Sequence, residues 1–134
     1  MLGKVLIGFD GSEAATRTVD WCIDAFEGTK TELLIVASAI MRPELGSAAN
    51  QSLAAEVQAG CDRMRDHATD RGLASRSLVL TGDPRSTILA CAEREGVDLI
   101  VIGSRGHSEL TDLVLGSVAS YLTHHSPRPV LVIR

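Results

Sequence analysis

Residues 97–117 read VDLIVIGSRGHSELTDLVLGS and place an apolar run directly before two sets of small residues. The run over residues 98–102 has the Val, Ile and Leu content of a parallel strand that is buried on both faces. It leads into Gly103, and Gly106 follows after Ser104 and Arg105. Glycines in a turn permit positive φ angles and let a ligand approach main-chain N–H groups without meeting a Cβ atom. The stretch therefore predicts a strand whose carboxyl end opens into a ligand-binding turn.

A second small pair, Gly116 and Ser117, is separated from Gly106 by nine residues and lies in an apolar-periodic segment that predicts a helix over residues 110–125. A glycine inside a helix costs about 1 kcal/mol relative to alanine. Close packing of two backbones would offset that cost. Ligand binding would also offset it, because a glycine lets phosphate or ribose oxygens approach the backbone and a serine offers them a hydroxyl. For a single glycine of this kind, both explanations stay open.

Composition limits the class of protein. The chain has 134 residues, a hydrophobic fraction of 45% and a formal net charge of −4, which suits one globular domain. Its positive residues are scattered, so no nucleic-acid footprint is expected. No apolar run reaches the roughly eighteen residues of a membrane span, and the first residues lack a signal-peptide pattern. We expect a cytoplasmic protein without a nucleic-acid or membrane partner.

The three cysteines, Cys22, Cys61 and Cys91, show no spacing typical of a metal or redox site. Each lies in a helical pattern, so we expect reduced, buried side chains.

Strand-like and helix-like segments alternate along the whole chain. Strands are predicted at residues 4–9, 32–40, 77–81, 98–102 and 129–134, and helices at residues 13–27, 47–67, 84–95 and 110–125. Ser12 and Asp83 are predicted N-caps, and Gly28, Gly72 and Gly96 are predicted helix ends. Residues 41–46 form the least regular part and predict a mobile loop over the site. The alternation predicts an α/β fold with a doubly wound parallel sheet.

Asp10 is the candidate functional residue of the first strand–helix junction. A carboxylate at the carboxyl end of a parallel strand lies at the edge where open α/β sheets bind ligands. The alternative is an Asx-turn carboxylate that accepts hydrogen bonds from nearby N–H groups.

The motif Gly103-x-x-Gly106, nine residues, Gly116-Ser117 resembles the nucleotide-binding signature of the universal stress protein family, without gap or insertion. The resemblance implies a five-stranded sheet of order 3-2-1-4-5, in which the two small-residue segments wrap the ribose and phosphates of ATP. It also implies that Asp10 lies beside the nucleotide and that Val36 lines the adenine pocket. Val36 is equally suited to be a plain core residue. Ile35 stands where the family often has histidine.

From this resemblance we expect a set of nucleotide-binding residues: Gly8, Phe9, Asp10, Val36, Ile102, Gly103, Arg105, Gly106, Gly116, Ser117 and Val118. Asp10 would contact a Mg²⁺ or Mn²⁺ ion carried by ATP. Arg85, in the first turn of its helix, either reaches a phosphate or is solvated.

Binding is better supported than catalysis. The chain has no G-x-x-x-x-G-K-[ST] motif, and neither Lys4 nor Lys30 belongs to the glycine turn. Ser104, His107, Ser108 and Asp112 are close in sequence, but no G-x-S-x-G elbow supports a hydrolase triad. The resemblance implies an ATP-binding stress-response regulator with at most slow ATP hydrolysis. The alternatives are a weak ATPase or adenylyl-group enzyme on the same fold, and an interaction protein with a vestigial site.

Two features near the end of the chain are candidates for further sites: a pair of histidines and the last strand. His124 and His125 are adjacent on a helix and point about 100° apart, so they make a poor chelating pair. The last strand lies at a sheet edge in the family's order, and an apolar edge needs cover. The resemblance therefore implies a homodimer through Val130–Ile133.

Overall fold

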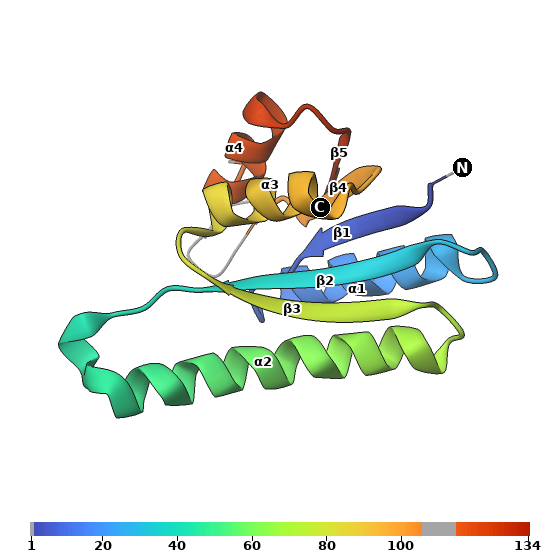
Figure 1. Ribbon diagram of the computed structural model, residues 1–134. Helices are drawn as coiled ribbons and strands as arrows, with labels where there is room; N and C mark the ends of the chain where they lie inside the picture. The colour runs from blue at the N-terminus through green and yellow to red at the C-terminus, as the bar shows by residue number, and fades with distance from the viewer. Residues whose placement is uncertain (1, 106–114) are drawn as a thin grey trace.

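The computed structural model describes residues 2–105 and 115–134, and it places a five-stranded parallel sheet between two layers of helices (Figure 1). The strands are β1 (Lys4–Gly8), β2 (Glu32–Ala39), β3 (Ser75–Thr81), β4 (Leu99–Gly103) and β5 (Val130–Ile133). The helices are α1 (Glu13–Phe26), the short 3₁₀ helix η1 (Pro43–Leu45), α2 (Gly46–Asp70), α3 (Pro84–Glu95) and α4 (Ser117–His125). The predicted doubly wound α/β architecture is confirmed.

The strand order is β3-β2-β1-β4-β5, as the resemblance implied, and every pairing is parallel. Gly8 is in register with Val36 of β2, and Ile7 with Val101 of β4. From β1 the chain continues to β2 and β3 on one side of β1, and it later crosses to β4 and β5 on the other side of β1. The carboxyl ends of β1 and β4 therefore flank a topological switch point, which is where open α/β sheets bind ligands.

The two faces of the sheet pack against different helices. Alternate strand residues such as Val5, Ile7 and Leu33 pack with α1 and α2, whereas Leu6 and Leu34 pack with α3 and α4. These strand side chains are fully buried, which explains why the strands appear as continuous apolar runs. The predicted burial of the three cysteines is confirmed, and burial raises the pKa values of Cys22 and Cys61 to about 12.

Helix ends follow the predicted signals. The Ser12 side chain accepts a hydrogen bond from the Ala15 amide, and the Asp83 side chain accepts one from the Arg85 amide. Gly96 ends α3 in the left-handed conformation with φ of +64°, which favours glycine. Ser126 ends α4, also as predicted.

Two predicted segments differ from the structure. Residues 41–46 contain η1 and run directly into α2, which begins at Gly46. The helix predicted from residue 110 does not include Leu115 or Gly116, because Gly116 has an extended backbone and α4 begins at Ser117. Leu110, Leu113 and Val114, which belong to that prediction, lie outside the described residues.

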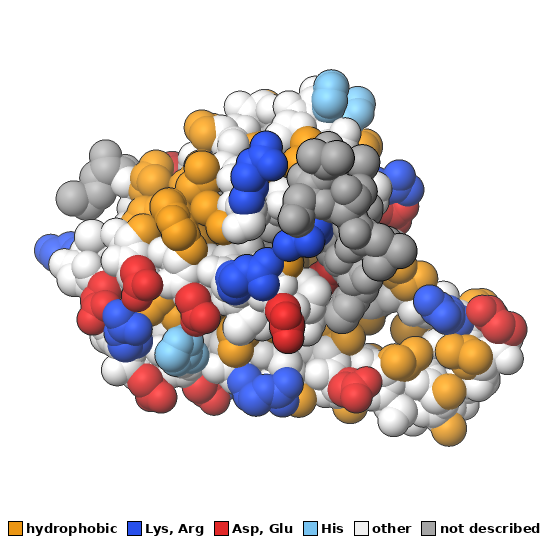
Figure 2. Space-filling model, turned by 180° about the vertical axis from the view of Figure 1, so that it is seen from behind, with side chains coloured by type: hydrophobic (Ala, Val, Ile, Leu, Met, Phe, Trp, Pro, Cys, Tyr) orange, Lys and Arg blue, Asp and Glu red, His pale blue; other side chains and the backbone are white. Residues whose placement is uncertain are grey.

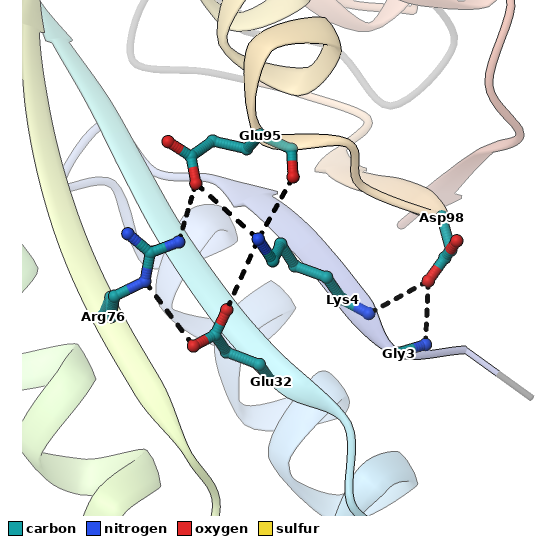
Figure 3. Close-up of polar contacts among 6 residues, drawn as sticks. All are labelled: Gly3, Lys4, Glu32, Arg76, Glu95 and Asp98. Carbon is teal, nitrogen blue, oxygen red and sulfur yellow. Dashed lines mark hydrogen bonds and ion pairs between the residues drawn. The ribbon is translucent and has the colours of Figure 1, made fainter.

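The amino end of the sheet is closed by a network of charged side chains (Figure 3). The Lys4 Nζ lies 3.8 Å from Glu32 and 3.7 Å from Glu95, and Arg76 lies 2.7 Å from Glu95. This network joins β1, β2 and β3 to the end of α3. Lys4 and Glu32 are the first residues of their strands, so the network lies at the end of the sheet opposite the switch point. In the part of the chain that the structure describes, no helix combines the length and apolar character of a membrane span.

Candidate functional site

A pocket of about 530 Å³ opens at the carboxyl ends of β1, β2 and β4, within the size range of small-molecule sites. The residues that line it come from the strand ends and from the starts of the helices that follow: Gly8, Phe9, Asp10, Ala15, Ala37, Ser38, Ala39, Ile40, Arg42, Leu53, Val57, Pro84, Ile88, Ile102, Gly103, Arg105, Gly116, Ser117, Val118 and Ala119. The pocket thus lies at the switch point predicted by the strand order.

Asp10 lies two residues after the end of β1, lines this pocket and is exposed. Its Oδ1 accepts hydrogen bonds from the Ser12 amide at 2.9 Å and the Ser12 hydroxyl at 2.5 Å. The Asx-turn explanation of Asp10 is therefore correct. It is compatible with a ligand role, because the same carboxylate also lines the pocket.

The glycines of the two adjacent strands serve close packing. A Cβ atom at Gly8 would lie 2.5 Å from Ile102 Cδ1, and one at Gly103 would lie 3.2 Å from the buried Thr18 Oγ1. Gly103 is the last residue of β4, and its φ is not positive. Gly103 therefore does not use the positive φ that glycine permits; its small size is required because α1 packs closely on this strand end.

Hydrogen bonds bring the two small-residue segments together. The Ser104 amide donates to the Ile133 carbonyl at 2.8 Å, and the Gly116 amide donates to the Ser104 carbonyl at 2.6 Å. The turn after β4 is thereby joined to the start of α4. Gly116 is the N-cap of α4 rather than a glycine inside a helix, so it carries no helix-interior cost. The first N–H groups of α4 begin beside the pocket.

Two predicted binding residues are not found at the pocket. Val36 is fully buried in the core with Leu6 and Ile88 and does not line the pocket. The expectation that its side chain lines the adenine pocket is wrong, because Val36 lies three residues before the end of β2, and Ala37, Ser38 and Ala39 take the lining positions. Gly106 lies outside the described residues, as do His107, Ser108 and Asp112. The other predicted binding residues all line the pocket.

The arm, which we define as residues 40–53, forms one wall of the pocket; the sequence predicted a loop over the site at residues 41–46 but none of the arm's lining residues. Ile40, Arg42 and Leu53 of the arm line the pocket, together with Val57. Figure 1 shows the arm projecting beyond the sheet, and Figure 2 shows hydrophobic side chains gathered at its far end. Ile40, Met41, Leu45 and Leu53 are exposed. The sequence signals for this wall were its position directly after the carboxyl end of β2 and the Pro43 and Gly46 of its irregular segment.

Asn50 fixes the start of the arm. Its side chain is 6% exposed, and its Oδ1 accepts a hydrogen bond from the Arg42 amide at 2.9 Å. Its Nδ2 donates to the Arg42 carbonyl at 2.8 Å and to the Gly46 carbonyl at 2.9 Å. Three main-chain groups are thus satisfied by one buried amide, so the segment is more regular than the irregular loop predicted from Pro43 and Gly46.

The charged side chains at the pocket have mixed sign. Arg42 and Arg105 contribute two positive charges, and Asp10 contributes one negative charge. Arg85 does not line the pocket, because its guanidinium is paired with Asp83 at 2.7 Å. The hydrogen bonds of Arg85 lower the pKa of Asp83 to about 2. The solvated alternative for Arg85 is closer to the structure.

The described residues contain no group of three or more His, Cys, Asp or Glu side chains that could hold a metal ion. His124 Nδ1 lies 2.7 Å from the Ser120 carbonyl, and the His125 ring lies against Tyr121 with centroids 4.3 Å apart. The two rings thus have separate neighbours. Among the residues that the structure describes, Asp10 is the carboxylate that lines the pocket.

Comparisons with known proteins agree with this geometry. The family model described as the universal stress protein family matches residues 1–134. Universal stress protein YxiE of Bacillus subtilis is 28% identical, and the alignment covers all of both chains.

Solved structures share the fold. Protein MJ0577 of Methanocaldococcus jannaschii is 26% identical with a TM-score of 0.88, over 98% of this chain and 94% of that one. A universal stress protein in complex with cAMP has a TM-score of 0.78 at 23% identity, over 99% of this chain and 97% of that one. The family match over the full length, together with the sheet order and the motif spacing, shows that the chain belongs to the universal stress protein family.

Proposed function

We propose that the pocket binds an adenine nucleotide, with ATP as the ligand, and that the protein acts as a stress-response regulator. The observation that carries this proposal is the meeting of Asp10, Arg105 and the Gly116-Ser117 pair in one pocket of about 530 Å³. Residues far apart in sequence supply a carboxylate, a cation and a helix start around a space of nucleotide size.

Two properties of the site support an anionic ligand. The start of α4 lies beside the pocket, and the N-terminus of a helix favours phosphate through its N–H groups and its dipole. Of the described residues that line the pocket, two are arginines and one is an aspartate, although the chain has a net charge of −4. A negatively charged ligand would therefore meet a locally favourable potential.

The strand ends that line the pocket suit a base, because Ala37, Ala39 and Ile102 offer small or apolar surfaces there. Two structural neighbours point to adenine: the cAMP complex, and a family member from Arabidopsis thaliana with AMP bound. Asp10 would face the ribose or a divalent ion carried by the phosphates, since carboxylate oxygens are preferred ligands of Mg²⁺.

Substitutions at Gly116 test the proposal. Gly116 has φ of −60° and ψ of 158°, which L-residues adopt, and it occupies an N-cap position where Asp and Asn are both favoured. Gly116→Asp therefore preserves the helix start while adding a negative charge at the pocket. We expect its ATP affinity in calorimetric titration to fall by more than about tenfold relative to Gly116→Asn, because like charges oppose binding.

The pair of variants separates charge from bulk. The Asp-to-Asn difference should grow from AMP to ATP as the ligand charge rises, and thermal unfolding should confirm that both variants fold. No ATP binding by the wild-type chain, or equal binding by the two variants, would contradict the proposal. Rapid, repeated phosphate release by the wild-type protein would instead favour an ATPase.

A further inference from the structure

Each of three adjacent strands is followed by a charged residue that lines the pocket. Arg42 follows β2, Asp10 follows β1 and Arg105 follows β4, and all three line the pocket. In the order β2-β1-β4 the two arginines therefore leave the sheet on either side of Asp10. Neighbouring strands are about 4.8 Å apart, so the ends of β2 and β4 are separated by roughly 10 Å. A single phosphate group is too small to occupy both positions.

Arg42 lines the pocket, and its main chain is held in place. Asn50 bonds both the amide and the carbonyl of Arg42, so the backbone from which the guanidinium extends is fixed. Within residues 2–105 and 115–134, Arg42 has no ion pair, whereas Arg71, Arg85 and Arg128 are each paired with a carboxylate. A ligand anion at Arg42 would not have to displace a carboxylate of the described residues.

The surroundings of Arg42 strengthen this argument. Ile40, Leu53 and Val57 line the same side of the pocket and are apolar. An ion pair formed beside apolar side chains is less screened than one in open water. If the 5′ phosphates of a nucleotide lie near Arg105 and α4, Arg42 faces the part of the ligand on the β2 side.

We propose that Arg42 forms a second anion subsite, which recognises a phosphate on the 2′ or 3′ position of the ribose of an adenine nucleotide that also carries a 5′ phosphate. This inference rests on the proposed function, because it assumes that the 5′ phosphates occupy the β4 side. It adds one class of ligand, the adenosine bisphosphates, to those expected for the pocket.

Calorimetric titration with three ligands tests this subsite: 5′-AMP, adenosine 3′,5′-bisphosphate and adenosine 2′,5′-bisphosphate. We expect the wild-type protein to bind one of the bisphosphates roughly fivefold to tenfold more tightly than 5′-AMP, as suits an exposed charge-assisted contact. Arg42→Gln should lose far more affinity for that bisphosphate than for 5′-AMP, and Arg42→Lys should retain part of the preference.

The matched control is Arg63→Gln. Arg63, on α2, resembles Arg42 in being exposed and in having no ion pair among the described residues. Unlike Arg42, it does not line the pocket, so this variant should bind all three ligands as the wild type does. Thermal unfolding checks that Arg42→Gln folds.

The outcomes distinguish the two proposals. Equal binding of 5′-AMP and both bisphosphates by the wild type would overturn the subsite alone. A loss in Arg42→Gln that is the same for every ligand would also overturn it. Failure of every nucleotide to bind would overturn the proposed function together with the subsite.

Discussion

The side chain of Asn50 determines the local structure of one wall of the pocket. It is buried, and both ends of its amide bond main-chain groups of Arg42 and Gly46. Asn50→Ala removes all three hydrogen bonds, and we expect the free energy of unfolding to fall by about 1–3 kcal/mol. Urea denaturation measures this change.

Asn50→Asp is the sharper variant, because its shape is nearly unchanged. It retains an oxygen for the Arg42 amide but places a second oxygen against the carbonyls of Arg42 and Gly46. We expect a larger loss of stability than in Asn50→Ala, because a buried carboxylate would face two acceptors. Equal stability of Asn50→Asp and wild type would show that the amide is not the group that holds the arm.

Single residues differed in how well the sequence predicted them. Asp10 was identifiable because its position after a strand is enough to place it at the ligand edge. Asn50 was not identifiable, because its partners are main-chain groups brought near it only by the turn at η1. Val36 was misplaced because the end of β2 decides which residues line the pocket, and the apolar run does not mark that end.

Between elements, the packing of the Ile102 and Ile88 side chains against the end of β1 depends on the missing side chain of Gly8. An added Cβ at Gly8 would meet Ile102 Cδ1 at 2.5 Å and Ile88 Cδ1 at 3.4 Å. Gly8→Ala should therefore reduce the free energy of unfolding by about 1–3 kcal/mol through overpacking. Ile102→Val removes the clashing Cδ1, so the double variant should be more stable than the sum of the two single changes predicts.

Chemical denaturation of the two single variants and the double variant completes this cycle. Gly60→Ala offers a comparison at another packed glycine, where the added Cβ would lie 3.3 Å from Phe9 Cε2. Ile102→Val should not rescue that variant, because the Gly60 contact is with Phe9. Strict additivity of Gly8→Ala and Ile102→Val would show that Ile102 is not what limits the size of residue 8.

Elements were predicted well where local chemistry marks both ends. α3 is bounded by Asp83, Pro84 and Gly96, and its observed limits match those signals. The start of α4 was missed because apolar periodicity continues through Leu115 and Gly116, and the change to extended backbone there carries no distinct residue signal. The hydrogen bond from Gly116 to Ser104 is a tertiary contact that periodicity does not contain.

At the scale of the molecule, the two ends of the sheet have separate roles. The amino end carries the ion pairs of Lys4, Glu32, Arg76 and Glu95 (Figure 3). The carboxyl end carries the pocket. Charges at the amino end are paired with one another, so they support the sheet without entering the site. This division leaves the switch point open for a ligand.

The two edge strands differ in composition. β3 carries polar and charged residues in SRSLVLT, while β5 is wholly aliphatic in VLVI. Pro129 and Ile133 accept hydrogen bonds from β4 through their carbonyls, so by alternation the main-chain groups of Val130 and Val132 point away from β4. An apolar strand with outward main-chain groups needs cover. We therefore propose that two copies pair through β5.

Val132→Pro tests this pairing at the level of the assembly. Proline removes an outward N–H while leaving the observed hydrogen bonds between β4 and β5 in place, and edge strands tolerate it. We expect light scattering at micromolar concentration to show a dimer for the wild type and a monomer for Val132→Pro, with unchanged circular dichroism. Val132→Ala shortens the same side chain but keeps the N–H, so it should remain dimeric. A monomeric wild type, or a Val132→Pro dimer as stable as the wild type, would show that β5 is not the interface.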